Sequence, residues 1–295
     1  MEKRNDMNSN LGIPKKLAMI NDLTGYGRCS LAVAIPIVST MGVQACPAPT
    51  SIFSNHMAFP TFHSTDYTKE LPEYLHAWEA LDVSFDGIFC GFLGNCTQVD
   101  TICRFLDEQI LKNYPMILVD PVMGDHGRLY SSVNSDYVAA IRELVCKAHI
   151  LTPNLTEACL LTGNAYPDSF PDDAFIPTGT FYGFLKEMAE ELHHFGPGKV
   201  VITGLQNGDR FYNFVSTPDG AELISSKAGG PSRPGTGDIF ASILSADALK
   251  NVPFTESVKK AAEFVRICTE GSAALNIPIK EGVCFENYLS LLTQL

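Results

Sequence analysis

The sequence lacks the patterns that mark several large protein classes. No C-x-x-C pair occurs among its nine cysteines, and most of them lie in apolar periodic segments, which indicates buried, reduced thiols rather than a zinc or redox motif. No stripe of basic residues is present, and 21 Lys plus Arg against 33 Asp plus Glu give a net charge of −12. We therefore expect neither a nucleic acid nor an anionic membrane as a partner.

Long hydrophobic runs are also missing. The longest apolar stretch, Leu31–Val43, contains Pro36 and is shorter than the roughly 20 residues that a membrane-spanning helix needs. The N-terminal stretch, Met1–Lys16, is polar and carries no hydrophobic signal region. Together with the odd number of cysteines, these absences predict a cytoplasmic protein.

Two common nucleotide-binding motifs are absent. Gly25-x-Gly27 follows a predicted strand, but Ser30 stands where the dinucleotide fingerprint needs its third glycine. Gly198-Lys199-Val200 lacks the hydroxyl residue that follows the lysine of a P-loop, and it precedes a strand instead of a helix. Any site for nucleotide phosphates must therefore use a different element.

The sequence does contain a regular alternation of strands and helices. Helical patterns separate apolar runs that predict buried strands, and two later runs predict an antiparallel hairpin. The predicted strands are Leu17–Ile20, Val43–Cys46, Thr50–Phe53, Asp86–Phe92, Met116–Val119, His149–Leu151, Lys199–Gly204, Arg210–Ser216 and Ala221–Lys227. This order predicts an α/β fold with a mostly parallel central sheet and a few antiparallel edge strands.

The chain shows no internal linker and no repeat. Residues 1–15 are polar and predict a flexible N-terminal tail, and residues 16–295 predict a single domain. Ser169–Thr178 predicts a surface insertion, because it contains two prolines and several acidic or small residues.

The stretch Arg233-Pro234-Gly235-Thr236-Gly237-Asp238 predicts a glycine turn that feeds a buried helix starting between Thr236 and Asp238. Such a start exposes unpaired N–H groups, and Gly235 and Gly237 let an anion approach them closely. The helix dipole is expected to keep Asp238 ionised, as suits a general base. The alternative is structural, with Thr236 as an N-cap and Asp238 as a residue that compensates the dipole.

Polar loops follow several of the predicted parallel strands. The loops after such strands open on one edge of the sheet, so their side chains can meet the glycine turn in a single crevice. These side chains are Asp120, Asp125, Thr152, Asn154, Glu157 and Thr203. Each loop alone has a structural explanation, since Asp125-His126-Gly127 is typical of a turn and Glu157 of a helix start, but the convergence favours a metal or phosphate site.

Three motifs carry a resemblance to a known superfamily. They are Arg233-Pro234-Gly235-Thr236-Gly237-Asp238, Asp120-Pro121-Val122-Met123-Gly124-Asp125 and Thr152-Pro153-Asn154-Leu155-Thr156-Glu157. In this order and spacing they resemble the ribokinase-like superfamily, and most closely its pyridoxal kinases. The resemblance runs from about Ala18 to the C-terminal helices and implies a ribokinase-like three-layer αβα sandwich.

The resemblance implies ATP-dependent phosphorylation of the 5′-hydroxymethyl group of pyridoxal, pyridoxine or pyridoxamine, with Mg²⁺ as a cofactor, in a homodimer. A requirement for a monovalent cation such as K⁺ stays open. The implied catalytic base is Asp238, beside an anion hole formed by Gly235, Thr236 and Gly237. The residues implied to surround Mg²⁺ and the phosphates are Asp120 and Glu157. The other implied nucleotide contacts are Asp125, Tyr130, Thr152, Asn154, Thr203 and Gly204. The implied vitamin pocket contains Asp22, His56, Met57 and Phe92, together with Asp238.

The implied vitamin pocket departs from the family pattern at three positions. Asp22, Met57 and Phe92 stand where the family often has Ser, Thr and Tyr. A carboxylate at position 22 favours a cationic or N–H-bearing ligand. We therefore expect pyridoxamine or pyridoxine to be used at least as well as pyridoxal. Two alternatives stay open: a hydroxymethylpyrimidine kinase of thiamine synthesis, and a catalytically silent vitamin-binding protein on the same scaffold.

Overall fold

The computed structural model describes residues 12–131, 133–167 and 179–293. Its main feature is a nine-stranded sheet with the strand order β11-β10-β9-β8-β5-β4-β1-β2-β3. The strands are β1 (Lys16–Tyr26), β2 (Gln44–Asn55), β3 (Ser64–Asp66), β4 (Gly87–Cys90), β5 (Met116–Val119), β8 (Ile150–Leu151), β9 (Lys199–Asn207), β10 (Arg210–Thr217) and β11 (Gly220–Lys227). A separate two-stranded ribbon pairs β6 (Gly124–Asp125) with β7 (Arg128–Leu129).

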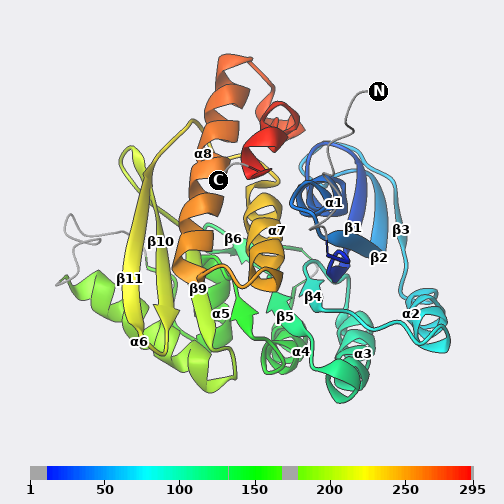
Figure 1. Cartoon of the computed structure of the whole chain (residues 1–295). Coiled ribbons are helices and arrows are strands. Elements are labelled where there is room, and N and C mark those ends of the chain that lie inside the picture. Colours follow the sequence, from blue (N-terminus) through cyan, green and yellow to red (C-terminus); the bar gives the residue numbers. More distant parts are fainter. Residues whose placement is uncertain (1–11, 132, 168–178, 294–295) are drawn as a thin grey trace, which may run out of the picture.

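Helices cover both faces of the sheet (Figure 1). One face packs against α2 (Leu71–Ala80), α3 (Cys96–Asn113), α4 (Ser135–Val145), α5 (Leu155–Thr162) and α6 (Thr180–His194). The other face packs against α1 (Ser30–Thr40), α7 (Thr236–Leu249), α8 (Phe254–Ala274) and the 3-10 helix at Glu286–Thr293, and a second 3-10 helix lies at Ile279–Glu281. Two apolar cores, one on each side of the sheet, result from this three-layer arrangement.

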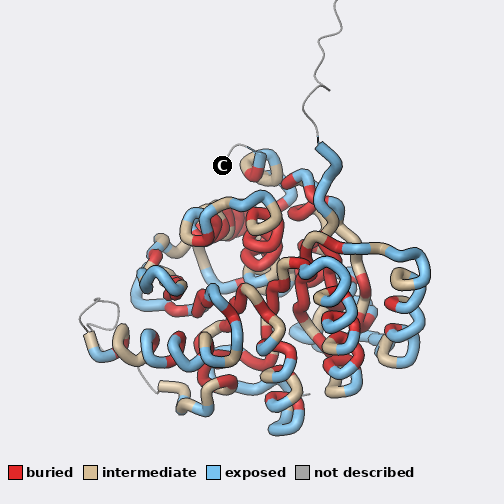
Figure 2. Tube along the Cα trace, turned by 60° about the horizontal axis from the view of Figure 1, so that its bottom comes forward, coloured by how far each residue is buried: buried red, intermediate tan, exposed pale blue. Residues whose placement is uncertain are grey.

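Six adjacent strands of the sheet run parallel, in the order β9-β8-β5-β4-β1-β2. Antiparallel pairing within this sheet is confined to β3 at one edge and to β10 and β11 at the other. The short central strands β4 and β5 are almost entirely apolar because both of their faces are covered (Figure 2). The predicted α/β sandwich with a mostly parallel sheet is therefore confirmed. The division into a tail at residues 1–15 and one kinase domain at residues 16–295 stays a prediction, and most of that tail and the predicted insertion at 169–178 lie outside the described residues.

Two predicted strand boundaries were wrong. β1 continues past Ile20 to Tyr26, because the buried polar residues of this part, among them Asp22 and Thr24, bond to each other and need no apolar pattern. β2 is one strand of 12 residues, although it contains Pro47 and Pro49. Prolines are tolerated there because β3 pairs with β2 only at Ser51–Phe53, so that β2 is an edge strand beside its prolines.

All nine cysteines are free thiols, and five of them are buried, as predicted, although Cys146 is exposed. No helix in the described part of the chain is both long and apolar enough to cross a membrane.

Candidate active site

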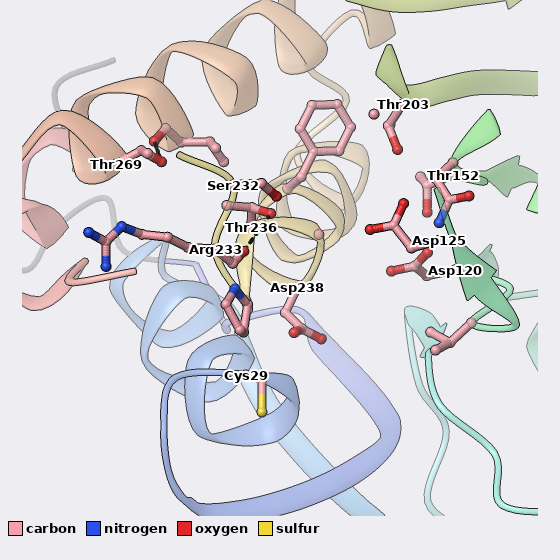
Figure 3. A pocket seen from close by; sticks show the side chains of 18 of the residues that line it. Cys29, Asp120, Asp125, Thr152, Thr203, Ser232, Arg233, Thr236, Asp238 and Thr269 are labelled. Atoms are coloured by element: carbon pink, nitrogen blue, oxygen red, sulfur yellow. Dashed lines mark hydrogen bonds between the residues drawn. The ribbon is translucent and has the colours of Figure 1, made fainter. Parts of the chain in front are cut away.

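A cavity of about 760 Å³ opens at the edge of the sheet where the parallel strands β1, β4, β5 and β8 end. Ligands of open α/β sheets bind at this edge. All of the site residues that the sequence predicts line this one cavity. They are Asp22, His56, Met57, Phe92, Asp120, Asp125, Tyr130, Thr152, Asn154, Glu157, Thr203, Gly204, Gly235, Thr236, Gly237 and Asp238. Figure 3 shows the carboxylates of Asp120, Asp125 and Asp238 pointing into the same space from opposite walls.

The glycine turn leads into α7, which begins at Thr236 with Gly235 as its N-cap residue in the left-handed region, at φ 88°. No side chain caps this helix. The Thr236 hydroxyl instead donates to the carbonyl oxygen of Arg233 at 3.2 Å, so the alternative in which Thr236 is an N-cap is wrong. The space in front of Gly237 is open, since a β-carbon there would meet only Asp120 Oδ2, at 3.9 Å. The first-turn N–H groups are thus available to an anion lying between α7 and Asp120.

Asp238 lies in the first turn of α7 and accepts hydrogen bonds from two other elements. Asn21 Nδ2 of β1 donates to its Oδ1 at 3.2 Å, and the backbone N–H of Ser30 donates to the same carboxylate. Desolvation nevertheless raises the pKa of Asp238 to about 6. Burial outweighs the helix dipole, which by itself would lower the pKa of Asp238. Asp238 is still mostly ionised at pH 7, and a pKa near the working pH suits a general base.

Asp120 and Glu157 form an acidic wall opposite α7. Burial and the nearby Asp238 raise the pKa of Asp120 to about 7. Burial and the charge of Asp120 raise the pKa of Glu157 well above its ordinary value. Buried carboxylates that repel one another in this way fit a cation between or beside them.

Glu157 also stabilises the start of α5, which is the structural role expected as an alternative for this residue. Its two carboxylate oxygens accept from the backbone N–H groups of Met123, at 3.1 Å, and Asn154, at 2.8 Å. The second bond completes a capping box at the start of α5. Within the described ranges no group of three or more His, Cys, Asp or Glu side chains could hold a metal ion. A Mg²⁺ ion here would thus take most of its oxygen ligands from phosphates and water, as is usual for this ion.

The wall beside β8 and β9 is built around Asn154. Its side-chain oxygen accepts from the N–H of Glu157 at 3.0 Å, and its Nδ2 donates to the carbonyl of Gly124 at 2.8 Å. Its backbone pairs with Thr203 in an isolated parallel bridge. Asn154 therefore joins the β6–β7 ribbon, which carries Asp125, to the middle of β9. Its amide is committed to these contacts, so it shapes the wall of the cavity.

The opposite end of the cavity contains the predicted vitamin pocket. Asp22 is 6% exposed and accepts from the hydroxyls of Thr24, at 2.8 Å, and Ser30, at 2.6 Å. Burial raises the pKa of Asp22. The His56 ring packs 4.7 Å from that of Phe59, and its Nε2 lies 2.6 Å from the carbonyl oxygen of Lys280.

Comparison with known proteins assigns the chain to a family. The sequence model of the phosphomethylpyrimidine kinase family matches residues 35–282. The chain belongs to this family. Among solved structures, a Bacteroides thetaiotaomicron protein assigned provisionally as a phosphomethylpyrimidine kinase is 31% identical, with a TM-score of 0.88 over 97% of this chain and 96% of the other. The pyridoxal kinase of Lactobacillus plantarum is 26% identical, with a TM-score of 0.84 over 96% of this chain and 98% of the other. These matches confirm the ribokinase-like fold.

Curated relatives in the family are also kinases by name. A pyridoxine/pyridoxal/pyridoxamine kinase of Bordetella pertussis is 27% identical over 85% of this chain and 87% of its own length. A pyridoxal kinase of Arabidopsis thaliana is 31% identical over 65% of this chain, and the match spans 59% of the Arabidopsis protein. The resemblance to pyridoxal kinases that the motifs indicated is therefore confirmed.

Three residues that the sequence motifs of this family member did not single out as site residues also frame the site. Asn21 and Ser30 contact Asp238 from β1 and from the start of α1. Arg233, only 5% exposed, donates from Nη1 to the carbonyl oxygens of Ile277, at 2.9 Å, and Pro278, at 3.2 Å. An arginine next to a glycine turn is visible in the sequence. Its burial and its partners are not, because the partners lie more than 40 positions away.

Proposed function

We propose that this chain is an ATP-dependent kinase that phosphorylates the 5′-hydroxymethyl group of pyridoxal, pyridoxine and pyridoxamine. The observation that carries the proposal is the position of Asp238, at the uncapped start of α7 and across one cavity from Asp120. A base, an anion site and an acidic wall at one edge of the sheet form the combination that phosphoryl transfer to an alcohol needs. The matches to kinases that act on these vitamers by name support the same substrate class.

The residues of the chain have separate tasks in this reaction. Asp238 accepts the proton of the acceptor alcohol. At the same time the alcohol oxygen attacks the terminal phosphorus of ATP, and the phosphorus–oxygen bond to ADP breaks. The first-turn N–H groups of α7, beside Gly235, Thr236 and Gly237, stabilise the charge on the transferring group. Asp120, supported by Glu157, would hold Mg²⁺, which neutralises phosphate charge when bound. Asp125, Tyr130, Thr152, Asn154, Thr203 and Gly204 would line the nucleotide side.

The vitamer preference depends on Asp22. Its carboxylate lies at the substrate end of the cavity together with His56, Met57 and Phe92. A buried carboxylate stabilises a ligand that brings a positive charge or an N–H group, so pyridoxamine or pyridoxine should be used at least as well as pyridoxal. Kinetics with ATP and Mg²⁺ on all three vitamers test this. Higher kcat/KM for pyridoxal than for both others would contradict it.

A second candidate is phosphorylation of hydroxymethylpyrimidine. The family to which the chain belongs bears the name of phosphomethylpyrimidine kinase, and a Haemophilus influenzae hydroxymethylpyrimidine/phosphomethylpyrimidine kinase is 27% identical over 69% of this chain. ADP release with the three vitamers and with hydroxymethylpyrimidine separates the two activities. We expect the vitamers to give the higher kcat/KM. Binding of a vitamer without ADP release at any Mg²⁺ concentration or pH would instead favour a silent binding protein.

We also propose that the protein is a homodimer. It would act in the cytoplasm, in vitamin B6 salvage. Leu23 of β1 and Ile52 of β2 are partners in register, and they are 37% and 42% exposed. Phe62, in the segment between β2 and β3, is also exposed. An exposed apolar group at the β1–β2 side suits contact with a second copy. Light scattering should give twice the chain mass, and Ile52→Glu should give the monomer. A monomeric wild-type protein would refute the dimer.

A further inference from the structure

The amide of Asn21 lies beside the proposed base and has only one possible orientation. Asn21 is 1% exposed, and its Oδ1 accepts from the backbone N–H groups of Asp22 and Phe92, each at 2.9 Å. A backbone N–H can only donate, so the atom that meets both of them must be the oxygen. The Nδ2 group is therefore the part of the amide that points to Asp238 Oδ1, at 3.2 Å.

The surrounding backbone is built to keep this amide in place. A β-carbon on Gly91 would lie 2.6 Å from Asn21 Nδ2, so only glycine leaves room for the side chain. The register between β1 and β2 shifts just after Asn21, between Asn21 and Leu23. The Asn21 side chain is thus held by backbone groups of β1 and of the segment after β4, independently of α7. It donates to Asp238 from a rigid sheet.

Four acidic groups interact electrostatically with Asp238. They are Asp22 of β1, Asp120 after β5, Cys29 before α1 and Tyr130 after β7. The neutral N–H donors from Asn21 and Ser30 therefore stabilise the ionised carboxylate against the repulsion of the carboxylates of Asp22 and Asp120.

We propose that Asn21 is a positioning residue for the transfer step: by donating to Oδ1 it fixes the Asp238 carboxylate and leaves a lone pair directed into the cavity for the proton of the acceptor alcohol. The inference rests on the proposed kinase function. In the step itself, the alcohol O–H bond breaks and its proton goes to Asp238, the alcohol oxygen bonds to the terminal phosphorus of ATP, and the phosphorus–oxygen bond to ADP breaks. Asn21 neither gives nor takes a proton, because a carboxamide does not titrate in this range.

The test is the variant Asn21→Asp. A carboxylate keeps an oxygen for the N–H groups of Asp22 and Phe92, but it replaces the donor with a second oxygen facing Asp238 Oδ1. Two carboxylates at this separation share a proton, so the acid limb of the kcat/KM profile should move up by about one pH unit or more. At pH 6.5, kcat/KM should fall roughly threefold for a displacement of one pH unit and further for a larger one, and it should recover largely at pH 9. ADP binding, measured by calorimetry, should stay within about threefold.

Asn113→Asp is the matched control. The Asn113 amide likewise donates one hydrogen bond, here to the backbone oxygen of Phe85 at 2.6 Å, but it lies at the end of α3, outside the cavity. We expect no displacement of its pH profile. If Asn21→Asp does not fold, Asn21→Ala serves the same test, because loss of the donor should displace the acid limb in the same direction by a smaller amount.

The outcomes separate this inference from the proposed function. A displaced acid limb with retained ADP binding supports the role of Asn21. An unchanged profile, or a loss of activity that is equal at every pH, overturns it. Asp238→Asn is measured in parallel: if that variant keeps full activity, the proposed base is wrong, whereas an inactive Asp238→Asn with an undisplaced Asn21→Asp profile removes the Asn21 inference alone.

Discussion

The backbone carbonyl oxygen of Arg28 occupies the space that a β-carbon on Gly235 would need. The two residues belong to segments about 200 positions apart, the approach to α1 and the approach to α7. Gly235 also has a φ of 88°, a conformation that strains any residue with a side chain. The start of α7 can therefore lie against the start of α1 only because position 235 is a glycine.

Replacement of Gly235 should accordingly damage both stability and activity. Gly235→Ala forces the two helix starts apart, so we expect a loss of about 1–3 kcal/mol in unfolding free energy and roughly a hundredfold loss in kcat. Chemical denaturation and steady-state kinetics measure the two effects. Gly183→Ala is the control, since a β-carbon there, in the first turn of α6, meets nothing within 4 Å, and it should be active and slightly stabilised. A fully active Gly235→Ala would show that α7 can shift without cost.

Removal of the proposed base should affect chemistry and leave nucleotide binding intact. Asp238→Asn keeps the shape of the side chain but cannot accept the alcohol proton, so kcat should fall roughly 10²–10⁴-fold. The dissociation constant of ADP should change little. Asp219→Asn, in the exposed turn between β10 and β11, is the control and should match the wild type. Turnover of Asp238→Asn near the wild-type rate would remove Asp238 from the proposed role.

The wild-type pH profile should follow the Asp238 carboxylate. Its pKa is raised to about 6, so the ionised base is present above that pH and is lost by protonation below it. We expect kcat/KM to fall tenfold per pH unit on the acid side, with the bend near pH 6. A profile that stays flat down to pH 5 would be incompatible with this base.

The buried carboxylate of Asp120 should lower the free energy of unfolding at neutral and alkaline pH. Its pKa rises from the ordinary 3.8 to about 7 in the folded chain, so the folded state binds a proton more tightly than the unfolded state does. The resulting destabilisation is absent below about pH 4, grows as pH rises and is complete above pH 7. Asp120→Asn should therefore have a higher Tm than the wild type at pH 8, and the gain should shrink at pH 5, while activity is lost. A Tm difference that is equal at both pH values would contradict this linkage.

Arg233 should matter for the segment after α8. Its Nη1 donates to the carbonyl oxygens of Ile277 and Pro278, and Arg233→Met leaves these partly buried oxygens without their donor. We expect the free energy of unfolding to fall by about 1–3 kcal/mol and hydrogen exchange to become faster in peptides that cover residues 275–283. Arg104→Met, on the exposed side of α3, should leave exchange in these peptides unchanged. Equal exchange in Arg233→Met and the wild type would show that the segment is held by other contacts.

The sequence predicts those parts of the site that depend on local chemistry. The start of α7 at Thr236 follows from Pro234 and Gly235, which cannot continue a helix, and the alternation of strands and helices brings the polar loops to one edge of the sheet. The contact of Asn21 with Asp238 joins residues 217 positions apart, so it depends on the order of strands in the sheet, which no local pattern specifies.

The electrostatics of the site were predicted less well, for a similar reason. The helix dipole acts within one turn and can be read from the chain, whereas the burial that raises the pKa of Asp238 comes from elements folded around it. Glu157 is a related case. Its position in the first turn of α5 is evident from the sequence, but its bond to the N–H of Met123 appears only when β5 and α5 are packed together.

The contacts of residues 277–282 have a consequence for how the protein is made. Two residues that line the cavity, Arg233 and His56, contact carbonyl oxygens of this stretch, and so does Arg28, next to the cavity residue Cys29. Domains begin to fold while the ribosome is still synthesising them. A nascent chain in which residues 277–282 are still inside the ribosome already contains every acidic residue of the cavity but lacks these contacts. The site should therefore become able to bind its substrates only after this stretch has left the ribosome.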